Sequence, residues 1–391
     1  MTSTDSVPAA RLPAVLAPSV LPRAIRHFTP NWFTASMGTG ILALALNQFP
    51  LPVPGLHGLA RALWLLNIGL FGLFCLLYGA RWLCCFDEAR RIFRHPVMSM
   101  FLGAIPMALA TILNGCLVFG PELIGAAAVP LAHVLWEVDA VLAVACGILV
   151  PYCMVTRQDH ALERMTAVWL LPVVACEVAA ASGGLLVAHL PAAHGYPVLL
   201  LSYVLWALSV PAALGILVIL LLRLVLHKLP GRDMAASGWL ALGPIGTGAL
   251  ALLLLGQEAQ RLGGSAGPAG LGDAAFGIGI VGGLILWGYG LWWLALAVLK
   301  TAHYLRRGMP FNLGWWGFTF PLGVYSLATL ALGRLTGFVP FSGIGAGLVV
   351  CLALFWTVVA ARTLRGALSG RLFHAPCLAA PAPVGLAGDG I

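Results

Sequence analysis

Long stretches without charged residues constrain this chain more than any other feature. From Met165 to Leu222 the only Asp, Glu, Lys or Arg is Glu177, and similar stretches fill most of the sequence. Only 9% of the 391 residues are charged, against roughly a quarter in soluble domains. A helix of about 20 apolar residues crosses a bilayer. We therefore predict an all-α integral membrane protein surrounded by a lipid bilayer.

Charged and turn-forming residues divide these stretches into ten segments of spanning length. The longest stretch is broken between Pro191 and Pro197, where two prolines and a glycine favour a turn. The segments form one transmembrane domain over residues 27–365, and the flanking residues 1–26 and 366–391 read as flexible tails. The predicted spans are 31–49, 60–83, 97–119, 129–155, 166–189, 198–226, 235–257, 274–303, 313–333 and 341–364.

The basic residues predict the orientation of these spans. Of the 21 Lys and Arg, 18 fall in the tails or in loops on the same side, which leaves Arg61, Arg261 and Arg334 for the other side. Basic loops remain in the cytoplasm during membrane insertion. We expect a multi-pass protein of the inner or plasma membrane with both termini cytoplasmic. Orientation also accounts for the net charge of +8, so we expect no nucleic-acid partner.

The odd-numbered spans differ in composition from the even-numbered spans. Every odd span carries a proline or a Gly-Thr-Gly triplet, whereas most even spans are plain apolar runs: the prolines are Pro106, Pro172, Pro244 and Pro321, and the triplets are Gly38-Thr39-Gly40 and Gly246-Thr247-Gly248. Single breaks of this kind are common in membrane helices. Their recurrence in every odd span predicts five helical hairpins, with odd helices around a central pore and even helices facing lipid.

Two longer motifs add a family resemblance. The segment from Phe311 to Thr329, FNLGWWGFTFPLGVYSLAT, resembles the ninth helix of the tellurite-resistance/dicarboxylate transporter family, which includes slow anion channels. The opening from His27 to Gly40 is similar to its sulfite-pump and malate-permease branch. The resemblance covers about His27 to Arg365. It implies five hairpins around a pore in each subunit of a homotrimer, transport of a small anion, and a pore plugged by Phe320.

The groups that could hold an anion are polar but uncharged. No odd span has Lys or Arg in its apolar middle, which leaves backbone N–H groups at the glycine breaks and three hydroxyls, those of Thr39, Thr247 and Thr319. Such weak sites favour throughput over tight binding, and a ring such as that of Phe320 can gate by keeping a constriction dry. Each threonine could instead bond to its own helix. Without the resemblance, Phe320 would be read as an ordinary packing residue.

Glu177 is the one charged residue near the middle of an odd span. A charge at this depth costs about 2.5–3.5 kcal/mol on insertion scales, which suggests a function. Burial favours the neutral acid, so Glu177 is a candidate for coupling proton movement to transport. The alternative is a structural hydrogen bond to a neighbouring helix. His133 and Glu137 are one turn apart, and we interpret them as a structural pair. We expect no metal site and no cofactor.

These features predict transport of a small anion. Within the family branch, sulfite efflux is the leading hypothesis, and transport of a C4-dicarboxylate such as malate is the alternative. A membrane enzyme would need His, Cys or carboxylate groups converging at one depth, whereas the histidines lie mostly in loops. We therefore do not expect an enzyme.

Overall fold

The structure, a computed structural model, describes residues 20–263 and 268–378. All regular structure in these residues is helical, as predicted. Nine helices among them are long and apolar enough to cross a membrane. A further helix, α2 (Phe33–Asn47), has 15 residues and is preceded by the short 3₁₀ helix η2 (Pro30–Trp32). The nine are Leu56–Cys84, Met98–Val118, Gly120–Arg157, Ala167–Val187, Ala192–His227, Arg232–Leu262, Leu271–Arg307, Leu313–Thr336 and Val339–Leu368.

Five helices form an inner ring. In order around the ring, each helix contacts the next and the last contacts the first. Between 72% and 89% of the apolar core of four of them is buried, and α2 is buried except at its last two residues. The members are α2, α5 (Ala104–Val118), α8 (Leu171–Val187), α10 (Leu242–Leu262) and α12 (Phe320–Thr336).

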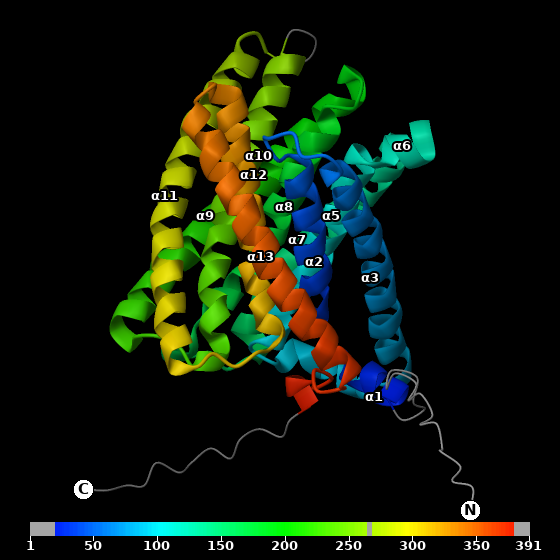
Figure 1. The fold of residues 1–391 in the computed structure, drawn as a ribbon, viewed down its shortest axis with the longest axis vertical. Coiled ribbons are helices and arrows are strands. Elements are labelled where there is room, and N and C mark those ends of the chain that lie inside the picture. The colour runs from blue at the N-terminus through cyan, green and yellow to red at the C-terminus, as the bar shows by residue number, and fades with distance from the viewer. Residues whose placement is uncertain (1–19, 264–267, 379–391) are drawn as a thin grey trace, which may run out of the picture.

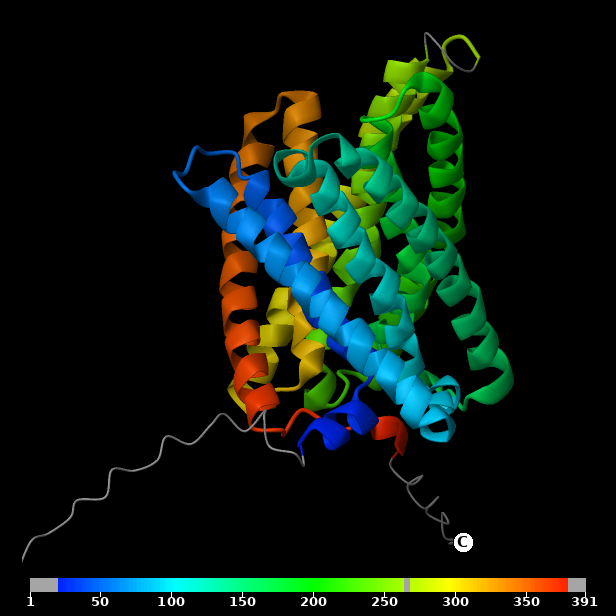
Figure 2. The ribbon, with the colours of Figure 1, turned by 90° about the vertical axis from the view of Figure 1, so that its right-hand side faces the viewer.

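Five longer helices surround the inner ring. Each packs on the inner helix that precedes it in the chain, and only 22–33% of their apolar cores is buried. Large apolar side chains such as Leu76 and Val155 are more than 70% exposed, which suits contact with lipid. Figures 1 and 2 show α3 and α13 on the outside of the bundle. The outer helices are α3 (Leu56–Cys84), α7 (Ala128–Arg157), α9 (Ala192–His227), α11 (Leu271–Arg307) and α13 (Val339–Leu368).

Every inner helix begins with a 3₁₀ segment, so the repeat seen in the sequence is also a repeat of backbone geometry. The burial of the inner and outer helices confirms the predicted difference between odd and even spans. The segments are η2, η4 (Met98–Gly103), η7 (Ala167–Leu170), η8 (Arg232–Ala241) and η9 (Leu313–Phe318). Four of them run directly into their α-helices, and Thr319 alone separates η9 from α12.

The sequence places these four prolines inside the predicted spans, and the structure places them at the junctions between 3₁₀ and α geometry. Pro172 and Pro321 are the second residues of their α-helices, and Pro106 and Pro244 are the third. The first turn of an α-helix has N–H groups without an intrahelical acceptor, so proline loses no hydrogen bond there. The break in each inner helix is therefore a change from 3₁₀ to α geometry.

The ends of the described chain lie together. Helix α1 (Val20–His27) and the 3₁₀ helix η10 (Pro376–Leu378), which fall within the expected flexible tails, lie at the same end of the bundle (Figure 1). Cys377 there accepts a hydrogen bond from Arg81 at 3.3 Å, and the ring of Phe373 stacks on Trp32 at 5.1 Å. Residues 1–19 and 379–391 of the expected tails lie outside the described residues.

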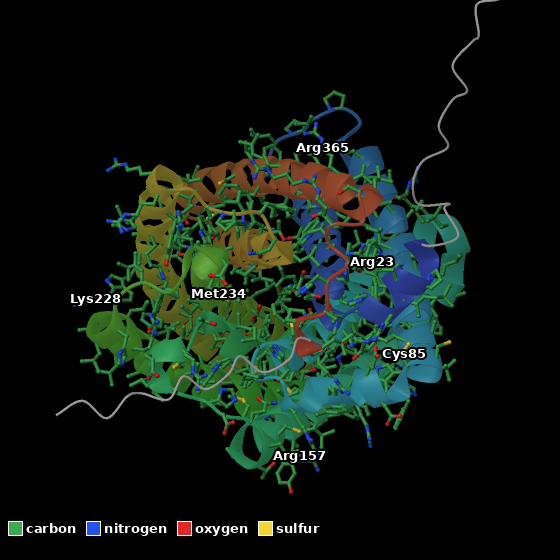
Figure 3. All side chains as sticks on the ribbon, turned by 90° about the horizontal axis from the view of Figure 1, so that it is seen from below. Arg23, Cys85, Arg157, Lys228, Met234 and Arg365 are labelled. Atoms are coloured by element: carbon green, nitrogen blue, oxygen red, sulfur yellow. The ribbon has the colours of Figure 1, made fainter. Side chains whose placement is uncertain are left out.

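Basic residues gather at this end of the bundle. Figure 3 views it from below and labels Arg23, Arg157, Lys228 and Arg365, which come from four different segments. At the opposite end two arginines are paired with carboxylates. Arg61 lies 2.7 Å from Glu122, and the second pair joins Arg261 to Glu258 at 2.6 Å.

Candidate functional site

A cavity of about 340 Å³ lies where the starts of the five inner helices meet. We call it the vestibule. Each inner helix or its 3₁₀ segment contributes to the wall: Thr34 from α2, Phe101 from η4, Leu171 from α8, Ser237 from η8 and Gly317 from η9. The vestibule is at the basic end of the bundle, where Met234, another lining residue, lies inside the circle of outer helices (Figure 3).

Local hydrogen bonds hold the polar wall of the vestibule in place. Asn312 accepts a bond from the N–H of Gly314 at 2.8 Å and donates its amide N–H to the backbone oxygen of Asp233 at 2.9 Å. It thereby ties the start of η9 to the start of η8. Asp233 supplies the one carboxylate among the lining residues. No lining residue is Lys or Arg, so an anion in the vestibule meets polar but uncharged donors.

His95 lies at the rim of the vestibule and is held as a neutral side chain. Its Nδ1 accepts hydrogen bonds from the N–H groups of Val97 at 3.2 Å and Met98 at 3.1 Å. Burial lowers the pKa of His95 below its ordinary value. An accepting Nδ1 places the proton of the neutral ring on Nε2. His95 therefore positions the start of η4 and adds no positive charge to the vestibule at pH 7.

Phe320 follows the vestibule residue Gly317 in the chain and is the first residue of α12. Its side chain is buried, with 3% exposed. It immediately precedes a proline, as do Ile105, Leu171 and Gly243 in three other inner helices. Leu171 lines the vestibule. Gly243 is buried, yet a Cβ at this position would meet no atom within 4 Å. The internal repeat thus relates Phe320 to positions that border space inside the ring.

Thr247 is a predicted site residue with an unused hydroxyl. It is buried, and its Oγ1 has no hydrogen-bond partner among the described residues. It follows Gly243 by one helical turn and therefore lies on the same face of α10. This is the face of α10 that borders the open space at Gly243, and a contact of the Thr247 hydroxyl with an anion stays a prediction.

The other two predicted threonines use their hydroxyls in packing. Thr39 donates to the backbone oxygen of Ala35 at 2.7 Å and accepts a bond from the indole of Trp356, on α13, at 3.0 Å. Thr319 donates to the backbone oxygen of Trp316 at 2.7 Å. These bonds match the local alternative considered for threonines in membrane helices.

The glycines of the two triplets allow close approach between helices. A Cβ at each would come within 3.1 Å or less of a neighbouring element, so a larger residue would push the helices apart. The neighbours are η9 and Thr319 for Gly38, α3 and α5 for Gly40, α12 for Gly246 and α9 for Gly248.

Glu177 is fully buried in α8, and neither of its carboxyl oxygens has a hydrogen-bond partner among the described residues. It lies near Gly248 of α10, where a Cβ would be 3.8 Å from Oε2, and it is not among the residues that line the vestibule. Asp139, on the outer helix α7, is buried in the same way and was not assigned a role from the sequence. Burial of a carboxylate in such surroundings costs free energy.

The predicted structural pair is present. His133 Nε2 lies 3.7 Å from Glu137 Oε1 on α7. Among the described residues, no three His, Cys, Asp or Glu side chains gather as they would around a metal ion.

Sequence reasoning missed the vestibule residues Thr34, Ser237 and Asn312, because they belong neither to the prolines nor to the Gly-Thr-Gly triplets of the odd spans. Gly243 was also missed, although its place before Pro244 repeats the Phe320-Pro321 pattern. Aligning the odd spans on their prolines would have identified Gly243 as the counterpart of Phe320.

An inner ring with an apolar exterior and a vestibule at one end suits a membrane transport protein. The chain belongs to the SLAC1 family, described as voltage-dependent anion channels, which it matches over residues 27–364. It is 40% identical to the sulfite efflux pump SSU1 of Arthroderma benhamiae over 357 residues, covering 90% of this chain and 94% of that protein. The pump of the same name from Trichophyton rubrum is 39% identical over 90% of this chain and 94% of its own length.

A more distant relative is named for a different substrate. The malic acid transport protein of Schizosaccharomyces pombe is 21% identical over 354 residues, covering 88% of this chain and 80% of that protein. These comparisons confirm the resemblance found in the sequence, and the chain is an anion transporter of this family.

Proposed function

We propose that the protein exports sulfite through a pore along the axis of the inner ring. The observation that carries the proposal is the vestibule, because all five inner helices contribute to its wall. The relatives named as sulfite efflux pumps cover nearly the whole chain, which favours sulfite over other small anions.

In this proposal the anion passes from the vestibule to the level of Phe320 and then to Thr247. The Thr34 and Ser237 hydroxyls already donate to the backbone oxygens of Asn31 and Met234. Amide N–H groups of the lining, such as those of Asn31, therefore replace part of the hydration shell of the anion without holding it tightly. Phe320 is the gate: its ring closes an apolar constriction, and its displacement admits water and anion. The prolines at the starts of α5, α8, α10 and α12 fix the geometry around this constriction.

We also propose ten transmembrane helices arranged as five hairpins, with α2 as the first span. An α-helix of 15 residues is about 22 Å long, shorter than the roughly 30 Å of a hydrocarbon core. Because α2 is enclosed by protein, its length need not match the lipid. The basic end is cytoplasmic in this arrangement, the membrane is the inner or plasma membrane, and the family resemblance favours a homotrimer. No enzymatic step or cofactor is required.

The second candidate substrate is a C4-dicarboxylate such as malate, favoured by the similarity to a malic acid transport protein. Purified protein in liposomes, with matched protein-free liposomes as the control, distinguishes the two. Sulfite, malate, chloride and nitrate fluxes should be measured with and without a pH gradient. We expect sulfite to move fastest. Malate flux above sulfite flux would instead assign the alternative substrate, and no protein-dependent flux of either anion would refute the proposal.

A further inference from the structure

A second, smaller cavity lies on the other side of η8 from the vestibule. Its volume is about 20 Å³, and a single water molecule needs about 10–15 Å³. Ser237 of η8 lines both cavities. The remaining wall comes from η7, the ends of α9 and α11, and the loop before η8.

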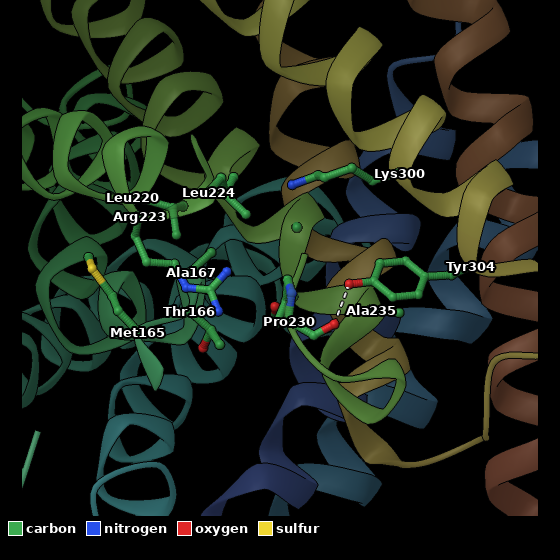
Figure 4. A pocket seen from close by; sticks show the side chains of 12 residues that line it. Met165, Thr166, Ala167, Leu220, Arg223, Leu224, Pro230, Ala235, Lys300 and Tyr304 are labelled. Carbon is green, nitrogen blue, oxygen red and sulfur yellow. Dashed lines mark hydrogen bonds between the residues drawn. The ribbon is translucent and has the colours of Figure 1, made fainter. Parts of the chain in front are cut away.

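Two cationic side chains enter this small cavity from opposite sides, Lys300 from α11 and Arg223 from α9 (Figure 4). Arg223 is 4% exposed. Its guanidinium donates to the backbone oxygen of Glu163 at 3.2 and 2.6 Å and to that of Lys228. Its bonds therefore fix the guanidinium in place but supply no negative charge.

Lys300 is even less satisfied. Among the described residues its ammonium group makes no hydrogen bond and no ion pair. Its Nζ lies over the Trp293 ring, 5.9 Å from the ring centroid. No Asp or Glu lines the small cavity. The nearby Asp233 lines the vestibule instead. Two largely buried positive charges thus share one cavity without a counter-charge, which is costly.

Hydrogen-bond donors are also available in the cavity. Lys300 offers three N–H groups, and Arg223 has N–H groups beyond those bound to carbonyls. The Thr166 hydroxyl accepts a bond from Val168 N at 3.4 Å, so its own proton remains free to be donated. The hydroxyl of Tyr304, by contrast, is used in a bond to the oxygen of Pro230 at 2.7 Å, shown dashed in Figure 4.

We infer that the small cavity binds one monovalent inorganic anion of about the size of a water molecule, a halide, between Lys300 and Arg223. The volume excludes a polyatomic organic anion, and the paired cations favour an anion over water. This site differs from the proposed transport path, because its lining shares only Ser237 with that of the vestibule. The bound anion neutralises the two cations and stabilises the packing of η8, α9 and α11 behind the vestibule wall.

Thermal unfolding in detergent tests this site without measuring transport, so its outcome does not depend on the proposed function. Chloride and bromide should raise the melting temperature above that in gluconate at equal ionic strength, since gluconate is too large for the cavity. Lys300→Gln should lose this halide-dependent shift. Lys228→Gln is the matched control, because Lys228 is exposed and its Nζ bonds only to the oxygen of Val225. An equal shift in wild type and Lys300→Gln would overturn the inference.

Bromide can also be located directly in the wild-type protein, which keeps the inference testable if Lys300→Gln does not fold. Crystals grown or soaked with bromide should give an anomalous peak within hydrogen-bonding distance of Lys300 Nζ and the Arg223 guanidinium. A map with bromide peaks elsewhere and none in this cavity would refute the site.

Discussion

At the scale of single residues, two buried carboxyl groups allow a functional role to be distinguished from a packing role. Glu177 and Asp139 are both fully buried carboxyls without hydrogen-bond partners among the described residues. Only Glu177 belongs to the inner ring, whereas Asp139 is on the outer helix α7. The two side chains therefore make a matched pair for testing proton coupling.

Glu177→Gln should remove most of the pH dependence of transport while leaving the protein active. The amide has nearly the shape of the neutral acid and cannot titrate. Sulfite and malate flux measured from about pH 5 to 8 checks this, a range above the ordinary carboxyl value. Asp139→Asn is the control and should keep the wild-type pH profile. If Glu177→Gln also keeps it, Glu177 is a packing residue.

His95 predicts a pH dependence of stability. Because the pKa of His95 is lowered in the folded protein, the unfolded chain binds its proton more readily, and the stability that His95 contributes is complete above about pH 6.5. This stability should fall as the pH drops below that value, by at most about 1.4 kcal/mol per pH unit. His95→Asn keeps an acceptor for the N–H groups of η4 but does not titrate. Its melting temperature should therefore vary less between about pH 7 and 5; an unchanged slope would refute this.

At the scale of elements, the junction between 3₁₀ and α geometry is the main difference between expectation and structure. Hydropathy identified the inner spans because a 3₁₀ segment and the α-helix after it together form one apolar stretch. For the same reason it could not show where one becomes the other, and Pro172 was placed in mid-helix. Tertiary contacts such as the bond from Trp239 to Thr301 at 2.8 Å hold these segments, and sequence reasoning does not reveal such contacts.

Two glycines of α10 test the packing of the inner ring. A Cβ at Gly246 would lie 2.7 Å from the backbone nitrogen of Tyr325, whereas a Cβ at Gly243 would meet no atom within 4 Å. Gly246→Ala should separate α10 from α12 and destabilise the protein by about 1–3 kcal/mol. Gly243→Ala should not destabilise it, since alanine favours helix. Melting temperatures of both variants check this, and equal losses would contradict the described space at Gly243.

At the scale of the whole molecule, the charge pattern predicts which end of the bundle is cytoplasmic. Single cysteines near Arg90, Lys228 and Arg306, in a background lacking reactive native thiols, should resist an impermeant reagent in intact cells. A cysteine at the exposed His194 should react. Ser265, a further predicted outside position, lies outside the described residues. Labelling of the Arg90 position from outside would overturn the proposed orientation.

The sequence alone supports much of this architecture but less of the pathway. The alternation of burial around the ring follows from composition, because breaks and small residues concentrate in helices that pack on other helices. The pathway depends on which face of each helix meets the axis. Thr39 and Thr247 stand in identical triplets, yet the first bonds to Trp356 and only the second has a free hydroxyl. That difference comes from packing between distant segments.

The central claim, an anion path along the inner ring gated by Phe320, is tested most directly by sulfite flux in liposomes. Phe318 supplies the control, because its ring packs on Trp239 at 5.5 Å and on Phe355 at 5.4 Å. Phe320→Ala should increase flux per folded protein, since removing the ring widens and wets the constriction. Phe318→Ala should lower stability, by about 3–5 kcal/mol, without increasing flux. Flux that is unchanged in folded Phe320→Ala protein, or increased equally by both substitutions, would contradict the gate.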